Sequence, residues 1–412
     1  MGAQAALVTR RGFVVELARR LHEYGTTAPR MEDAINLVAA RLQLDCNVLS
    51  TPTSIVMSFS DTNASPHGLA EVTQVVRLPP GEVNLKRLCQ ADEIADRVIE
   101  GQLDLAEGYA LLREFGNQRD SRFSRTLMVA AFGVASAAIA LILRADWVSA
   151  GTAMLIGLVI GATALRAGSR PNVAAAFEAV SAMAATAIAI VVAFYIAPIA
   201  VRLVVIASLI VLMPGMTLTT AVRELSSQHL VSGTARLMGA MATLLKLAFG
   251  TVAATQLLGL LGITVQATPT APLPGWVDWV AVSAGALAFA VIFRAAWRHY
   301  PIVIGAVLLG YLCTRYGSAQ LSPTFGAFIG GLLLGALSNI YARIAHRPGA
   351  LVREPGIILL VPGSVGFSTV SLMLGNDVML GIGTAITLFS LLIAIVAGLL
   401  FGDLLVPPRR KL

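Results

Sequence analysis

The chain has 412 residues, of which 56% are hydrophobic and only 13% are charged. A soluble protein of this length carries roughly twice that charged fraction, so the composition excludes an ordinary soluble protein and indicates a polytopic membrane protein. The formal net charge of +7 would suit nucleic-acid binding, but the basic residues stand mostly between apolar runs, where they orient a membrane protein. We therefore expect a lipid bilayer and no nucleic acid as the partner.

Residues 1–120 are predicted to form a small, soluble α+β domain. Apolar residues recur at helical spacing between Arg11 and Tyr24, and Thr27 and Pro29 are typical of the start of a second helix. Short β-branched runs follow, and two further helices are expected at about 85–102 and 105–115. No GxSxG or HExxH motif is present, so we expect the domain to regulate, assemble or gate rather than to act as an enzyme.

The three cysteines, Cys46, Cys89 and Cys313, lie far apart in the sequence, and no CxxC motif or histidine cluster accompanies them. We infer reduced thiols, no metal site and no cofactor. The N-terminus lacks an apolar segment of the kind found in signal peptides, so no cleaved signal peptide is expected.

A basic, polar linker from Gly116 to Arg125 precedes ten apolar segments. Most of these segments approach the roughly 20 residues that a helix needs to cross a bilayer. They are 126–143, 148–165, 173–195, 201–221, 237–261, 276–293, 301–313, 324–341, 357–374 and 378–401. With the N-terminal domain in the cytoplasm, most loop arginines and lysines fall inside and only Arg144, Arg202 and Arg315 fall outside. This bias predicts a multi-pass plasma (inner) membrane protein whose N-terminal domain and C-terminus are both cytoplasmic.

The membrane part repeats itself at an offset of about 150 residues. The matching pairs are Pro214-Gly215 with Pro362-Gly363, Arg166–Ser169 with Arg315–Ser318, and Gly233–Ala235 with Gly383–Ala385. Each half contains five spans, an odd number, so the halves must insert with opposite orientation. We expect two inverted five-helix repeats, 121–262 and 263–412, a common plan for secondary transporters.

The Pro-Gly pairs predict a break inside one helix of each half, because proline removes a backbone donor and glycine removes rigidity. Such breaks are tolerated in a membrane only where protein or a water-filled cavity surrounds them, and they mark a transport site. Exposed amide ends suit a carboxylate, and nearby hydroxyls suit an ammonium or hydroxyl group. The candidate substrate- or ion-binding residues are Pro214, Gly215, Thr217, Thr219, Thr220, Pro362, Gly363, Ser364, Ser368 and Thr369. The alternative for each hydroxyl is a bond to its own helix backbone.

Two charged residues within the predicted spans complete the candidate site. Lys246 lies ten residues beyond Arg236, which places it about 15 Å into the bilayer. We expect Lys246 to face the central cavity and either to pair with an acid such as Glu178 or to exchange a proton during transport. The alternatives are a structural ion pair or a shifted span for Lys246, and a place near the cytoplasmic interface for Glu178.

Three stretches of the chain resemble the threonine/serine exporter family. They are YGTTAPRMEDAINLVAARLQL at 24–44, NVLSTPTSIVMSF at 47–59 and LMPGMTLTTAVREL at 212–225. The resemblance implies export of threonine and serine across the plasma membrane, driven by the proton gradient, and we expect alternating access at a site near mid-membrane. Some members divide the same architecture between two subunits that are linked to dicarboxylate export, so a succinate-like substrate is the alternative.

Other classes of protein explain the sequence less completely. A membrane-anchored enzyme or signalling protein needs a single span, and ten spans with a repeat are unexplained by that function. A channel has no need of coupling and stays an alternative. The expected partners are a small amino acid, protons and lipid, and assembly as a homo-oligomer is left open.

Overall fold

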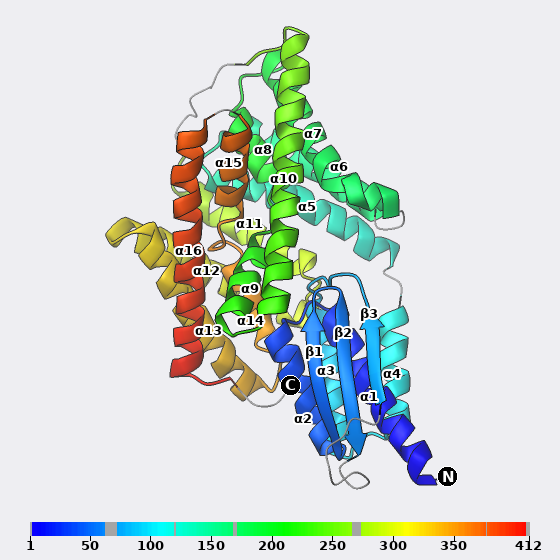
Figure 1. The fold of residues 1–412 in the computed structure, drawn as a ribbon. Coiled ribbons are helices and arrows are strands. Elements are labelled where there is room, and N and C mark those ends of the chain that lie inside the picture. Colours follow the sequence, from blue (N-terminus) through cyan, green and yellow to red (C-terminus); the bar gives the residue numbers. More distant parts are fainter. Residues whose placement is uncertain are drawn as a thin grey trace.

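The computed structural model describes residues 2–61, 72–118, 121–167, 171–265, 273–375 and 377–408. These residues are mostly helical, with one three-stranded antiparallel sheet near the N-terminus. Figure 1 shows the sheet domain at one end of a helical body, and the last helix of the chain ends at that same end. Residues 119–120 of the expected linker and 168–169 of the first repeated Arg-x-Gly-Ser sequence lie outside the described residues.

In the N-terminal domain two helices contact the sheet, and two more pack behind them on the same side (Figure 1). Its elements are α1 (Gly2–Glu23), α2 (Ala28–Arg41), β1 (Leu44–Thr51), β2 (Ser54–Asp61), β3 (Val72–Arg77), α3 (Leu85–Ile99) and α4 (Leu105–Asn117). Alternate residues of β2, namely Ile55, Met57 and Phe59, are at most 1% exposed and form the core with the helices. The two helices expected after the β-branched runs are therefore present as α3 and α4.

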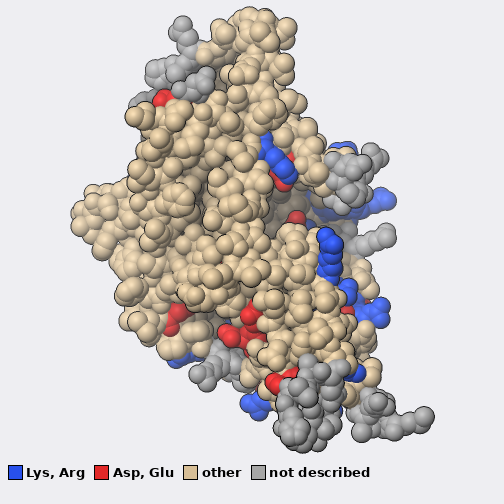
Figure 2. Space-filling view, viewed as in Figure 1, with Lys and Arg blue, Asp and Glu red and all other residues tan. Residues whose placement is uncertain are grey.

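The helical body contains both long helices and short, broken ones. In chain order they are α5 (Arg122–Ile142), α6 (Trp147–Ala167), α7 (Pro171–Tyr195), α8 (Val201–Leu209), α9 (Gly215–Ser226), α10 (Leu230–Leu260), α11 (Trp276–Ile292), the 3-10 turn η1 (Trp297–His299), α12 (Tyr300–Gln320), α13 (Pro323–Ala345), α14 (Ala350–Ile357), α15 (Gly363–Leu374) and α16 (Val378–Leu405). Figure 2 shows that charged side chains are sparse on the surface of this body and more frequent around the sheet domain.

Seven helices in the described part of the chain are long and apolar enough to cross a membrane: α5, α6, α7, α10, α12 with its preceding turn, α13 and α16. The polytopic helical class is thus confirmed, with seven candidate spans rather than ten continuous ones. Helix α11 has only 17 residues, and the segments expected at 201–221 and 357–374 contain the two breaks. The run expected at 301–313 is longer than its apolar residues indicate, because α12 continues through the polar residues up to Gln320.

The two Pro-Gly pairs break their helices in the same way. Pro214 has φ −80° and ψ 40°, and Pro362 has φ −82° and ψ 45°. After each proline the chain turns tightly, so that Gly215 N donates to Met213 O at 2.8 Å and Gly363 N donates to Val361 O at 2.9 Å. Because proline cannot donate to the carbonyl four residues back, α8 and α14 end before it and α9 and α15 begin after it.

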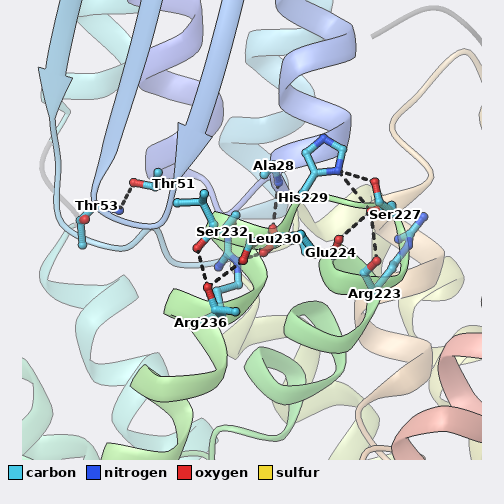
Figure 3. A network of polar contacts seen from close by, with 12 residues as sticks. Ala28, Thr51, Thr53, Arg223, Glu224, Ser227, His229, Leu230, Ser232 and Arg236 are labelled. Atoms are coloured by element: carbon cyan, nitrogen blue, oxygen red, sulfur yellow. Dashed lines mark hydrogen bonds and ion pairs between the residues drawn. The ribbon is translucent and has the colours of Figure 1, made fainter.

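The N-terminal domain is fixed to the helical body by buried polar contacts. Glu224 of α9 is fully buried and accepts hydrogen bonds from Ala28 N at the start of α2 (3.0 Å) and from Ser232 Oγ (2.8 Å), and it forms an ion pair with Arg236 (2.9 Å) (Figure 3). His229 Nε2 lies 3.2 Å from Glu32 Oε2 of α2.

A second contact joins two helix ends. The first amides of α3, Leu85 N and Lys86 N, donate to Phe293 O and Arg294 O at the end of α11, at 3.0 and 3.1 Å. The unpaired donors of one helix thereby satisfy the unpaired acceptors of the other. The domain therefore contacts the ends of α9, α10 and α11.

Candidate functional site

The two helix breaks, far apart in the sequence, meet in the structure. A Cβ atom built on Gly215 would lie 3.1 Å from Gly363 Cα, and one built on Gly363 would lie 3.3 Å from Gly215 Cα. The Cβ on Gly215 would also collide with Val361 Cγ1. Glycine is required here because the two backbones pass each other without room for a side chain. We call this contact between the starts of α9 and α15 the crossing.

Each break leaves backbone groups without intramolecular partners. Among the described residues, no hydrogen bond reaches the carbonyls of Ile210, Val211 and Leu212, or those of Ile358, Leu359 and Leu360. The amides of Met216 and Thr217, and those of Ser364 and Val365, likewise donate to no acceptor in the described chain. Pro214 and Pro362 are the N-cap residues of α9 and α15, and neither helix has a side-chain hydrogen bond that caps its first amides. The crossing therefore presents both free acceptors and the positive ends of two helices.

The predicted hydroxyl residues divide into two groups. Thr219 Oγ1 donates to Gly215 O at 3.2 Å and Thr369 Oγ1 donates to Val365 O at 2.8 Å, so these two follow the alternative of bonding to their own helices. The other four are partly exposed and have no hydrogen bond within the described residues: Thr217, Thr220, Ser364 and Ser368. They remain able to bind a ligand or water.

Lys246 of α10 reaches Glu178 of α7, with Nζ 3.5 Å from Oε2, and the two side chains are 42% and 24% exposed. The structure does not bring the pair to the crossing. Leu244 packs toward α15, since a Cβ on Gly366 would lie 3.2 Å from Leu244 Cδ1. Two residues further along a helix the side chain points about 200° away, so Lys246 faces α7 instead.

A polar network that the sequence interpretation missed ties together the end of the body nearest the sheet domain. Arg353 of α14 is 6% exposed and donates to Asp403 Oδ1 of α16 at 3.2 Å and to Ser338 Oγ of α13 at 3.0 Å. Arg223 of α9 binds the other oxygen of Asp403 at 2.9 Å, and Asn339 Nδ2 donates to Oδ1 at 2.7 Å. Helices α9, α13, α14 and α16 are thereby joined through one carboxylate.

A small cavity of about 20 Å³ lies between this network and the N-terminal domain. Arg30, Arg223, Arg353 and Glu354 are among its lining residues. The buried Arg353 Nε has no hydrogen-bond partner among the described residues, which is the pattern expected beside a bound water.

A second network lies where α11 begins. Asp278 is 2% exposed and binds both Arg144, at 2.6 Å, and Arg315. Two of the three arginines expected outside the membrane thus share one buried carboxylate as their partner. Long-range pairs of this kind follow from helix packing and carry no local sequence signal.

No group of three or more His, Cys, Asp and Glu side chains in the described part of the chain is arranged to hold a metal ion. Burial raises the pKa of Cys46 and of Cys89 to about 12, so both thiols of the N-terminal domain stay protonated at neutral pH.

Comparison with known proteins shows a family match over most of the chain. Two family models, both described as threonine/serine exporter, match residues 12–258 and 278–405. Curated relatives include the pheromone-regulated membrane protein 10 of several yeasts. The protein from Zygosaccharomyces rouxii is 25% identical over 441 residues, which cover 99% of this chain and 44% of the relative. The protein from Eremothecium gossypii is 25% identical over 437 residues, which cover 99% of this chain and 57% of the relative.

The Saccharomyces cerevisiae protein is 24% identical over 374 residues, which cover 88% of this chain and 47% of the relative. The chain therefore spans about half the length of the curated relatives it matches. No solved structure matches it. Because the two family models together cover nearly the whole sequence, the chain belongs to the threonine/serine exporter family.

Proposed function

We propose that the chain exports small hydroxylated amino acids, threonine and serine, and that the crossing is its substrate site. One observation carries the proposal: two broken helices from different parts of the chain meet at Gly215 and Gly363 and leave their backbone groups unpaired. Groups of this kind cost several kcal/mol each in hydrocarbon, of order 2–7 kcal/mol, unless a ligand or water binds them.

The free groups suit a zwitterion. The amides of Met216, Thr217, Ser364 and Val365 would bind a carboxylate at a helix N-terminus, and the freed carbonyls of the breaks would accept an ammonium group or coordinate an ion. The unpaired hydroxyls would bind the substrate's own hydroxyl. Recognition by paired dipoles needs no charged side chain, and residues 209–219 and 357–369 contain none.

Matching local geometry supports an inverted repeat of five helices, with each broken pair crossing the membrane once and ten crossings in all. The two breaks share their dihedral angles, and Arg144 and Arg294 take positive φ values of 65° and 52° after α5 and α11. The sheet domain and the end of α16 lie at one end, as an even number of crossings requires. The basic residues expected inside include Arg223, Arg236 and Arg353, all in the networks at that end. We assign this end to the cytoplasm of a cell whose plasma membrane holds the protein.

Alternating access would open one end of the crossing at a time. The ion pairs of Asp403 with Arg223 and Arg353 hold the cytoplasmic end, and those of Asp278 hold the opposite end. The pair of Lys246 and Glu178 is our proposed proton-coupling element, because protonation of the carboxylate would release the ammonium group. Coupling would then act through α7 and α10, not by contact with the substrate.

A second substrate class is favoured by one feature of the same site. Both helix N-termini point toward the crossing, and a small dicarboxylate such as succinate would place one carboxylate on each. A zwitterion needs the free carbonyls as well as the amides, whereas a dicarboxylate needs only the amides. Counterflow measured with each compound distinguishes the two substrate classes.

The test is counterflow by the purified full-length chain in proteoliposomes. Vesicles loaded with unlabelled threonine, serine or succinate are mixed with the labelled compound, with and without a pH gradient. The proposal predicts exchange of threonine and serine and stimulation of net flux by the gradient. Exchange of succinate alone would assign the site to dicarboxylates, and exchange of none of the three would reject the proposal.

A further inference from the structure

A separate cavity of about 610 Å³ opens between the N-terminal domain and the helical body. Its walls come from the start of α3, the start of α5 and the loop that joins α11 to α12. None of its described lining residues belongs to α9 or α15, so it is distinct from the crossing. It lies at the end of the body where α5 begins and α11 ends, which is a membrane boundary if these helices span the bilayer.

The charge of this cavity is one-sided. Its lining includes four basic residues, Lys86, Arg87, Arg294 and Arg298, and the described lining residues include no aspartate or glutamate. Lys86 has no side-chain hydrogen bond or ion pair within the described chain, and Arg298 donates only to His299 Nε2, at 3.3 Å. Lys86 and Arg298 therefore have no carboxylate partner within the described chain, and an anion with several oxygens could bind both of them.

The cavity also has an apolar side. Leu127 and Met128 of α5 line it, and Leu127 is 39% exposed. Trp297 lines it and is 84% exposed, which is costly in water but typical of a tryptophan at the level of lipid headgroups. Basic groups beside apolar ones match a molecule with a phosphate at one end and acyl chains at the other. A free phosphate would leave the apolar side unused.

The opposite end of the body offers an internal comparison. Each half has a similar turn after its first helix. Arg144-Ala145-Asp146-Trp147 follows α5 and Arg294-Ala295-Ala296-Trp297 follows α11, and the arginine of each turn has the left-handed conformation. There, however, Arg144 is paired with Asp278, and Asp146 accepts a hydrogen bond from Ser149 N at 2.6 Å. At the end with the cavity, Ala296 stands at the position that corresponds to Asp146. The backbone conformation is shared, and the two turns differ in having Asp146 at one end and Ala296 at the other.

We propose that this cavity binds the phosphate headgroup of an anionic phospholipid, with Lys86 and Arg298 as its unpaired cationic contacts. Anionic lipids are enriched in cytoplasmic leaflets, which agrees with the orientation proposed above. A lipid held between α3 and the α11–α12 loop would bridge the N-terminal domain and the helical body. The site is independent of which substrate the crossing carries.

The experiment measures lipid binding to the full-length chain by native mass spectrometry and by thermal shift in detergent. Phosphatidylglycerol is compared with phosphatidylcholine, and glycerol 3-phosphate and inorganic phosphate are tested as soluble probes. The cavity variant combines Lys86→Gln with Arg298→Gln. The matched control combines Arg41→Gln with Arg97→Gln, which removes the same charge from exposed positions outside the cavity.

We expect preferential binding of phosphatidylglycerol, weakened about thirty-fold in the cavity variant and unchanged in the control. Equal melting temperatures of both variants in phosphatidylcholine would show that folding is intact. Three results would overturn the proposal: equal binding of the two lipids, undiminished phosphatidylglycerol binding in the cavity variant, or glycerol 3-phosphate binding as tightly as the lipid, which would assign the cavity to a soluble anion.

Discussion

Replacing Gly215 with alanine places one methyl group in the middle of the crossing. The new carbon would collide with Val361 Cγ1 and would lie 3.1 Å from both Cα and N of Gly363. Overpacking of this kind costs about 1–3 kcal/mol, because the backbone of the partner break has to move. If transport requires α9 and α15 to bind substrate and shift at this contact, that cost converts to transport roughly 5-fold to 150-fold slower.

Two other glycines calibrate the result. At Gly363 the nearest contacts of an added Cβ are 3.3 Å, so Gly363→Ala should slow transport less than Gly215→Ala. At Gly239 of α10 nothing lies within 4 Å, and alanine there should be neutral or stabilise the helix by up to about 1 kcal/mol. Counterflow rates at matched protein content should follow this order. Wild-type rates in Gly215→Ala would refute the reasoning.

The remaining predictions concern the charges around the crossing and in the N-terminal domain. Lys246→Met should abolish stimulation of export by a pH gradient, and unchanged pH dependence in this variant would remove the coupling role. The variant leaves the charge of Glu178 without a partner in a span, which costs about 2.5–3.5 kcal/mol. Adding Glu178→Gln removes that charge, so the double variant should restore membrane insertion without restoring coupling. Glu224→Gln should lower the free energy of unfolding by about 3–5 kcal/mol, because it removes the buried charge that pairs with the partly buried Arg236. Glu93→Gln at the half-exposed pair with Arg347 should cost at most about 1 kcal/mol, and equal thermal shifts in the two variants would contradict this. Burial lowers the pKa of His22, so the unfolded chain takes up its proton first and stability should fall as pH drops below about 6.5 toward the lower folded value. In His22→Gln that part of the pH dependence of melting should disappear, and an identical profile would show that other groups cause it.

The sequence predicted the local features of the site because they depend on neighbouring residues. A proline followed by glycine breaks a helix wherever it occurs, and Pro214 and Pro362 do so with the same dihedral angles. It could not predict that the breaks touch, since that contact depends on the packing of the whole body. Nor could it separate Thr219, which bonds to its own helix, from Thr217, which does not.

Charged residues show the same division between local and long-range information. Pairing with Glu178 was one of two possibilities for Lys246, because an isolated charge in a span needs a partner, and the structure places the two side chains 3.5 Å apart. The place of Lys246 in a central cavity stays a prediction. The partners of Asp278 and Asp403 come from distant helices and have no motif. One readable signal was missed: Arg-Ala-x-Trp recurs at 144–147 and 294–297 and marks equivalent turns in the two halves.

The most direct test of the crossing as the substrate site is protection of introduced cysteines. Thr217→Cys and Ser368→Cys are made separately in a chain from which Cys313 has been removed. The two remaining cysteines, Cys46 and Cys89, are buried and protonated and give little background labelling. Thr163→Cys on α6, whose hydroxyl bonds to its own helix, is the control. The account predicts that a small methanethiosulfonate reagent labels both site cysteines, and that threonine slows this labelling but not labelling of the control. Labelling at Thr217→Cys and Ser368→Cys that is unaffected by threonine, serine and succinate in a chain that still transports would contradict it.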